Sequence, residues 1–280
     1  MEEVIIKAEK LCYSYDNDNR NALNQLTLEI KKGEKVAVMG ANGSGKSTFF
    51  LCCNGINRPS SGVLYFHGQP IEYSKKGLLN LRSKIGIVFQ DPDIQLFSAS
   101  VYQEISFGIL NMGVDEETAR GKVEQVIREL EITPFRQQPT HALSVGQKKQ
   151  VSIADILVMN PEVMILDEPT AALDPKHTTM VKRLINQVSE QGTTVMMAIH
   201  DVDYALQWAD TVLLFHEGML LKAGNPLEVF EDVALLQQCN LEQPMVIQIF
   251  KRLQKKGILD STIEQPRSMQ ELTQCIEECC

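Results

Sequence analysis

The sequence predicts an α/β fold in which strands flank a helical insert and a compact helical tail follows. Three observations predict this arrangement. The apolar run at 35–39 leads into a glycine-rich loop and then a helix. Helical periodicity dominates from about residue 99 to about residue 160. After residue 160, strand-like runs alternate with helical segments, which is the βαβ pattern of a parallel sheet that binds ligands at the carboxyl ends of its strands.

The predicted strands are short runs of β-branched or apolar residues. In chain order they are Val4–Ile6, Leu26–Ile30, Lys35–Met39, Gly62–Phe66, Ile85–Phe89, Val163–Leu166, Thr194–Ile199, Thr211–Phe215 and Met219–Ala223.

Capping residues and apolar spacing predict the helices. In the insert, Asp115 can cap a helix whose first turn is acidic. Its apolar residues recur at near-helical spacing at Ala119, Val123, Ile127 and Leu130. Later helices are predicted at Pro175–Glu190 and Asp201–Ala209.

A helical tail is predicted after about residue 235. Met245, Ile249 and Leu253 share one helical face, and Ser268 with Glu271 forms a capping box ahead of a second helix. The tail can form a dimer contact or pack on its own domain, and packing is the favoured reading.

The composition excludes several classes of protein. The formal net charge of −9 argues against general nucleic-acid binding, which needs clustered Lys and Arg. No stretch approaches the roughly 18–20 apolar residues of a membrane helix, and the N-terminus lacks the basic start of a secretory signal. We therefore expect a cytosolic protein.

The seven cysteines give only a weak metal signal. Four of them lie in apolar settings typical of core residues: Cys12, Cys52, Cys53 and Cys239. Helical spacing would bring Cys275 and Cys279, next to Cys280, onto one face. Because no His lies near them, a plain amphipathic helix end is the favoured reading.

The run from Gly40 to Ser47 fills every fixed position of a P-loop. Its glycines allow successive N–H groups to point at one anion, and the helix that begins near Lys46 adds its dipole. We expect Lys46 to contact the β- and γ-phosphates of a nucleoside triphosphate, Ser47 to bind Mg²⁺, and Thr48 to support the loop. The predicted nucleotide-binding residues here are Gly40, Asn42, Gly43, Ser44, Gly45, Lys46, Ser47 and Thr48.

Two carboxylates follow the predicted strand Val163–Leu166. An apolar strand that ends in Asp-Glu is often only a solvated strand end, but beside a P-loop it indicates a hydrolytic site. Asp167 is then expected to hold Mg²⁺, and Glu168 to polarise the water that attacks the γ-phosphate.

Four further motifs follow the P-loop in order: Leu143–Gln147, Asp167–Thr170, Ala172–Asp174 and His200–Asp201. With the P-loop they resemble the ATP-binding cassette (ABC) ATPases over roughly residues 4–235. The resemblance implies a P-loop ABC ATPase domain at 1–235, with a mixed sheet, flanking helices, an antiparallel β part and an inserted helical subdomain at about 92–160. Residues 236–280 would form a small helical C-terminal extension.

The same resemblance implies a site shared between two cassettes, either identical copies or paralogues. They would face each other head to tail, so that the segment from Ser144 of one closes over ATP held by Lys46 of the other. Ser144 can cap its helix while the following amides donate to the γ-phosphate. The residues that would contact nucleotide across this interface are Ser144, Gly146, Gln147 and Asp174.

Other roles also come from the resemblance. Gln90 would sense Mg²⁺ and the attacking water, so that the Mg²⁺ set is Ser47, Gln90 and Asp167. His200 would contact the γ-phosphate and complete a catalytic set with Glu168 and Gln90. Tyr15 would stack on adenine, although Tyr13 is a nearby competitor and core packing is an equal alternative.

Two positions depart from the family pattern. The family usually has Gly where this chain has Val145, and Arg where it has Gln150. Gln150 leaves one cation missing. Val145 restricts the phosphate-facing loop but does not remove its amides or Ser144, so we expect weakened but not abolished closure on ATP.

The segments Gly68–Leu78 and Leu81–Phe97 narrow the resemblance to the ATPase subunit of energy-coupling-factor (ECF) importers, most closely the cobalt/nickel type. That family implies a peripheral protein on the cytoplasmic face of the cell membrane, with an integral coupling protein and a substrate-capture membrane subunit. Leu96 and Phe97 could pack against a coupling helix, or be ordinary core.

Two rival functions remain open. A soluble ABC ATPase that acts on ribosomes or DNA would usually carry a second cassette, a coiled coil or a basic arm, and none is evident here. The cassette of a vitamin ECF importer, or of another ABC importer, is the nearer alternative because a cassette does not contact the cargo.

Overall fold

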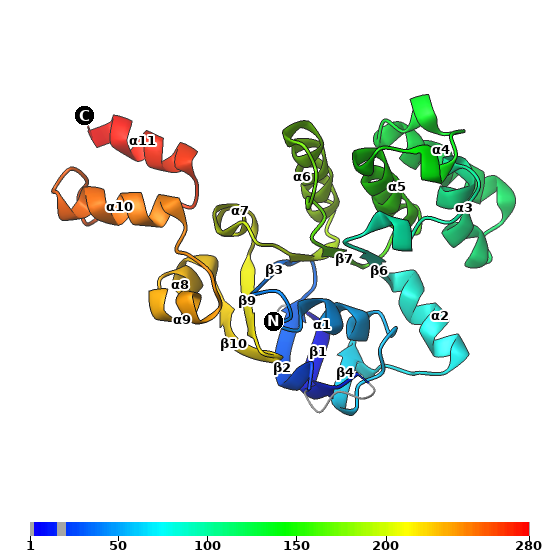
Figure 1. Cartoon of the computed structure of the whole chain (residues 1–280), viewed down its shortest axis with the longest axis horizontal. Coiled ribbons are helices and arrows are strands. Elements are labelled where there is room, and N and C mark those ends of the chain that lie inside the picture. Colours follow the sequence, from blue (N-terminus) through cyan, green and yellow to red (C-terminus); the bar gives the residue numbers. More distant parts are fainter. Residues whose placement is uncertain (1–2, 16–20, 280) are drawn as a thin grey trace.

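The computed structural model describes residues 3–15 and 21–279 and has two sheets and several groups of helices (Figure 1). The larger sheet has the order β10-β9-β3-β8-β7-β6. Its strands are β10 (Met219–Gly224), β9 (Thr211–His216), β3 (Lys35–Met39), β8 (Thr194–Ala198), β7 (Val163–Asp167) and β6 (Ile85–Val88). All neighbours are parallel except β10 and β9, so the sheet is mixed, as predicted.

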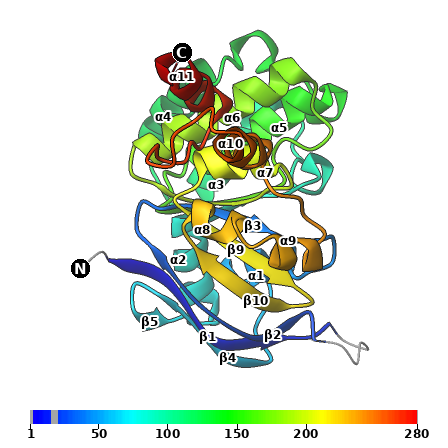
Figure 2. The same ribbon diagram turned by 90° about the vertical axis from the view of Figure 1, so that its left-hand side faces the viewer.

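The smaller sheet is antiparallel, with the order β2-β1-β4-β5. Its strands are β1 (Val4–Tyr13), β2 (Leu23–Lys31), β4 (Ser61–Phe66) and β5 (Gln69–Pro70). Figure 2 shows it below the larger sheet, with helix α1 (Lys46–Cys53) between them. Phe49 and Phe50 of α1 are fully buried in a core that includes strands of both sheets. This burial fixes the helix that follows the glycine-rich loop.

Helices fill the chain between β6 and β7. They are α3 (Val101–Asn111), α4 (Glu116–Glu129) and α5 (Val145–Leu157), capped by the side chains of Ser100, Asp115 and Ser144. Ala119, Val123, Ile127 and Leu130 are buried, which confirms the predicted face of α4. An additional helix, α2 (Lys75–Lys84), precedes β6 and was not predicted, because it is mostly polar and buries only Leu81.

The remaining helices follow the later strands. They are α6 (Pro175–Glu190), α7 (Val202–Trp208), α8 (Pro226–Phe230) and α9 (Val233–Gln238). Asp174 and Asp201 cap α6 and α7, so both predicted helices are confirmed.

The tail consists of α10 (Met245–Lys255) and α11 (Met269–Cys279), at the opposite end of the long axis from α3–α5 (Figure 1). The predicted apolar face of α10 is wrong at one position, since Met245 is 55% exposed. Val246 and Ile247 instead join the main core, because α10 packs on α7 and its neighbours as well as on α11. Ser268 caps α11, but the Glu271 carboxylate accepts from the N–H of Arg267 rather than of Ser268.

The tail packs on its own domain. The Arg267 guanidinium donates to the carbonyl of Leu206 (2.9 Å) and to that of Ala209. Of the C-terminal cysteines, Cys275 is partly exposed, whereas the Cys279 side chain and Cys280 lie outside the described residues. Within 3–15 and 21–279 we find no cluster of metal-ligating side chains, and no helix there is long and apolar enough to span a membrane.

Candidate nucleotide site

The strand order brings four loops to one edge of the larger sheet. Strands β3, β8, β7 and β6 are neighbours and parallel, so their carboxyl ends meet. The loop from Gly40 follows β3, His200 follows β8, Glu168 follows β7 and Gln90 follows β6. The predicted residues therefore converge although they are far apart in the sequence.

The glycines of the loop after β3 are required by its shape. Gly40 and Gly45 have φ values of +141° and +105°. A Cβ at Gly40 would lie 2.2 Å from the carbonyl oxygen of Phe215, and one at Gly45 would lie 2.7 Å from that of Ala22. Side chains are thus excluded sterically, and the backbone amides of the loop turn into α1.

Lys46 is held inside this loop. It is 5% exposed, and its ammonium donates to the carbonyls of Gly40 (2.9 Å) and Ala41 (3.0 Å). Burial lowers the pKa of Lys46, while the carboxylates of Glu168 and Asp167 oppose this shift. A phosphate beside Lys46 would supply the negative charge that the buried ammonium lacks.

Ser44 gives an independent indication that an anion fits here. Its hydroxyl is buried and has no hydrogen-bond partner among the described residues. A buried polar group without a partner is unfavourable by about 1–3 kcal/mol. A phosphate oxygen would accept this hydroxyl, so the residues present fit a nucleotide.

Ser47 and Asp167 lie together at the end of β7. Asp167 is 8% exposed. Burial raises the pKa of Asp167, the hydrogen bond from Ser47 opposes the rise, and the charge of Glu168 adds to it. A hydroxyl and a carboxylate beside a phosphate site are oxygen ligands of the kind that Mg²⁺ takes.

Glu168 is held between the other two predicted catalytic residues. Its backbone is left-handed, with φ +46°. The Gln90 amide donates to Oε2 of Glu168 at 2.9 Å, and Nε2 of His200 lies 2.7 Å from Oε1. The structure therefore assembles the predicted set of Glu168, Gln90 and His200 in one hydrogen-bonded group.

Tyr15 lies beside the same loop. Its hydroxyl is 3.1 Å from the Thr48 hydroxyl, and the residue is 45% exposed. The ring of Tyr13 meets that of Tyr15 edge to face at 4.9 Å and packs against the core. Of the two candidates, Tyr15 is the more exposed.

The second predicted group forms a separate cluster. The Ser144 hydroxyl accepts from the N–H of Gln147 (3.3 Å), whose side chain accepts from the N–H of Ser144 (3.0 Å), which is a capping box. A Cβ at Gly146 would lie 2.4 Å from the ring of His177. That ring is bonded to Asp174 at 2.6 Å. No hydrogen bond or ion pair between described residues joins this cluster to Lys46 or Glu168.

The two departures from the family pattern have different settings. Val145 is 51% exposed at the first turn of α5. Gln150 is buried, and its amide donates to the carbonyl of Leu130 at the end of α4. Position 150 therefore lies inside the helical subdomain, where the neutral Gln150 amide bonds to α4.

Lys149, which is 1% exposed, was not predicted as a residue of the site. Its ammonium donates to the carbonyls of Phe89 (2.9 Å) and Gln90 (2.7 Å). Burial lowers the pKa of Lys149 to about 8, against the attraction of nearby carboxylates. The sequence pattern that could have indicated its burial is the helical spacing, which places Lys149 on the same face as Ile153 and Ile156.

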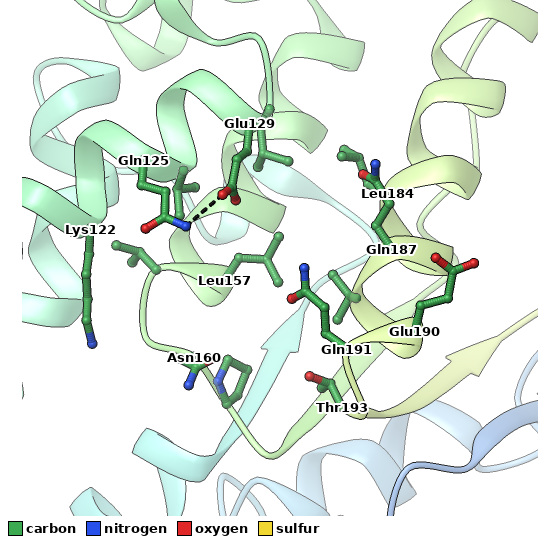
Figure 3. A pocket seen from close by; sticks show the side chains of 15 residues that line it. Lys122, Gln125, Glu129, Leu157, Asn160, Leu184, Gln187, Glu190, Gln191 and Thr193 are labelled. Atoms are coloured by element: carbon green, nitrogen blue, oxygen red, sulfur yellow. Dashed lines mark hydrogen bonds between the residues drawn. The ribbon is translucent and has the colours of Figure 1, made fainter.

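A cavity of about 600 Å³ lies elsewhere, between α4, α5 and α6 (Figure 3). Its lining includes Lys122, Glu129, Leu157 and Gln191. None of the predicted site residues lines it, so it is not part of the nucleotide site.

Comparison with known families and relatives agrees with the geometry. A family model described as ABC transporter matches residues 23–171. The chain is 45% identical over 273 residues to the energy-coupling factor transporter ATP-binding protein EcfA2 of Clostridium perfringens (strain SM101), with 95% of each chain covered. It is 41% identical over 252 residues to EcfA of Methanocaldococcus jannaschii, with 90% of each covered.

Solved structures show the same similarity. One is cbiO1 from Clostridium perfringens, described as part of the ABC transporter complex cbiONQ, with a TM-score of 0.74, 45% identity, and 89% of this chain and 100% of that chain covered. Another is a dimeric, post-hydrolysis structure of the ATP-binding cassette MJ0796 bound to ADP and Pi, with a TM-score of 0.72, 26% identity, and 79% and 99% covered.

Proposed function

This chain belongs to the ATP-binding proteins of ABC transporters, and we propose that it energises import through an ECF-type complex in the cell membrane. It is an ATPase of that family. The observation that carries the proposal is the carboxylate of Glu168, held between Gln90 and His200 next to the buried Lys46 and Asp167.

The residues of the site have distinct roles in the proposed reaction. The loop amides, Lys46 and Ser44 bind the β- and γ-phosphates, which offset the buried charge of Lys46. Glu168 orients the attacking water and accepts its proton as the bond from the γ-phosphorus to the β-phosphate oxygen breaks. Mg²⁺, when bound, would be held by oxygens of Ser47, Asp167 and Gln90 and would neutralise phosphate charge.

The Ser144 cluster completes the site in a second cassette. Among the residues that the structure describes, no hydrogen bond or ion pair joins the Ser144 helix end to Lys46. The capped N-terminus of α5 nevertheless presents amides suited to an anion. We infer that Ser144, Gly146, Gln147 and Asp174 act on the nucleotide of the partner. The likeness to a dimeric cassette structure supports this arrangement, with an identical or a paralogous partner.

An exposed apolar patch supports the membrane partner. Ile94, Phe97 and Phe107 are 71%, 67% and 49% exposed, and the two rings meet edge to face at 4.9 Å. The patch lies on the helical subdomain and is suited to a coupling helix of an integral membrane subunit. ATP binding would close two cassettes, and hydrolysis would open them, so that the membrane subunit senses the change.

Cobalt or nickel is the proposed cargo, transported through a separate capture subunit. The segment Gly68–Leu78 resembles that type of ECF cassette, and the similar cbiO1 belongs to a cbiONQ complex. A vitamin importer is the alternative, because no residue of the site contacts the cargo.

Co-purification from native membranes tests the proposal. Tagged protein is extracted in mild detergent, and the stoichiometric partners are identified by mass spectrometry. Recovery of an integral coupling protein with a metal-capture subunit supports the whole proposal. Recovery of a vitamin-capture subunit supports ECF import but changes the proposed cargo to a vitamin. Recovery with ribosomes, or without any membrane protein, contradicts transport.

A further inference from the structure

Lys149 is a buried charged group of the helical subdomain. It is 1% exposed, and no ion pair between described residues includes it. A methionine has similar length and would fill the space without burying a charge. Beside its attraction to the carboxylates of Asp167, Asp91 and Glu168, the ammonium provides two hydrogen bonds, to the carbonyls of Phe89 and Gln90.

These two hydrogen bonds fix the backbone on both sides of the Gln90 Cα. One carbonyl belongs to the peptide group before Gln90 and the other to the peptide group after it. Gln90 itself is exposed and lies two residues after Val88, the last residue of β6, so the sheet does not hold its side chain. Lys149 therefore sets the direction from which the Gln90 amide donates to Glu168.

Helix α5 connects Lys149 to the second cluster. The helix begins at its cap, Ser144, and Lys149 lies five residues later, which corresponds to about 7–8 Å along the axis. A movement of the Ser144 end thus moves the ammonium that holds Gln90.

We propose that Lys149 is a positioning residue that ties Gln90, and through it Glu168, to the position of helix α5. The rate of ATP turnover at the chain's own site then depends on the position of the N-terminal end of α5, which Ser144 caps. This inference rests on the proposed roles of Glu168 and Gln90, and adds to them a link that neither family pattern nor sequence spacing assigns.

A double-mutant cycle tests the proposal, with ATP turnover of the purified wild-type complex and of the variants K149M, Q90A and K149M/Q90A. We expect K149M to lower kcat by about 10–100-fold, with KM for ATP within about threefold, because a displaced group misaligns the reaction without touching the nucleotide. In the Q90A background, K149M should lower kcat by less than about twofold. A decrease in that background as large as in the wild type overturns the proposal, and so does wild-type turnover by folded K149M.

Matched variants exclude a merely structural effect. K149R keeps donors for both carbonyls, so its kcat should recover most of what K149M loses. K148M removes the neighbouring charge, which pairs with exposed Asp93 at 2.6 Å, and should keep kcat within about twofold. If K149M does not fold, K149Q replaces it in the cycle with the same two outcomes. E168Q is measured in parallel, and near-normal turnover of E168Q contradicts the proposed function. If E168Q is inactive but K149M lowers kcat by the same factor in the wild-type and Q90A backgrounds, only the role of Lys149 is contradicted.

Discussion

Glu168→Gln is the substitution that removes the proposed general base while keeping the hydrogen bonds of its side chain. In the wild type, Oε2 of Glu168 accepts from Gln90 at 2.9 Å and Oε1 lies 2.7 Å from Nε2 of His200. A glutamine in the same rotamer can accept from Gln90 with its oxygen and donate to a neutral His200 with its amide. Both contacts, and the volume of the side chain, are kept.

The loss is therefore confined to proton acceptance. A positioned general base contributes about 10²–10⁴-fold, which corresponds to about 2.7–5.5 kcal/mol of activation free energy. We expect kcat for phosphate release to fall by that factor. The dissociation constant for ATP should stay within about threefold, because Lys46 and the loop amides are unchanged.

Phosphate release and calorimetric ATP titration measure the two quantities on the same preparation. Glu131→Gln is the matched control, because Glu131 also has a left-handed backbone (φ +55°) but is an exposed partner of Arg183. The control should keep kcat within about twofold. A kcat for E168Q within about threefold of the wild type would refute the assignment of Glu168 as the base.

Three other predictions concern binding, packing and pH. Lys46→Ala should weaken ATP binding by at least about tenfold in calorimetry, because it removes the ammonium inside the phosphate loop, and unchanged affinity would contradict that geometry. Gly146→Ala should lower the free energy of unfolding by about 1–3 kcal/mol in urea, because its Cβ would lie 2.4 Å from the His177 ring, and His177→Ala should relieve most of this loss. Burial, and then the charge of Glu104, raise the pKa of Asp155 well above its usual value, so the folded chain binds this proton more tightly than the unfolded chain. Asp155→Asn should therefore be more stable than the wild type at pH 8, with the difference vanishing as the pH falls to about 4, and a pH-independent difference in Tm would contradict this burial.

Local patterns predicted most of the fold. The positions of the predicted strands, the cap at Asp115 and the two helices after β7 and β8 each depend on residues close in sequence, and the structure confirms them. Strands β1 and β2 are longer than predicted, and the short strand β5 was not predicted. Helix α2 was not predicted because its sequence is mostly polar and only Leu81 is buried. The side chain of Ser74 caps this helix.

The candidate site could be predicted as residues but not as contacts. Glu168 lies 78 residues from Gln90 and 32 from His200, so only the strand order brings the three together. Neither the burial of Gln150 nor the hydrogen bonds of Lys149 follows from motif matching, because both depend on how α5 packs against α4 and β6. Met245 was misplaced for a similar reason, since α10 packs on two surfaces at once.

Sedimentation of the E168Q chain with and without Mg²⁺-ATP, alone and with any second cassette that co-purifies, tests whether two cassettes share one nucleotide site. We expect ATP to convert the chain into a two-cassette dimer, because the Ser144 end of each cassette closes over nucleotide held by Lys46 of the other. No ATP-dependent association, with itself or with the co-purified cassette, would contradict a site shared between two subunits.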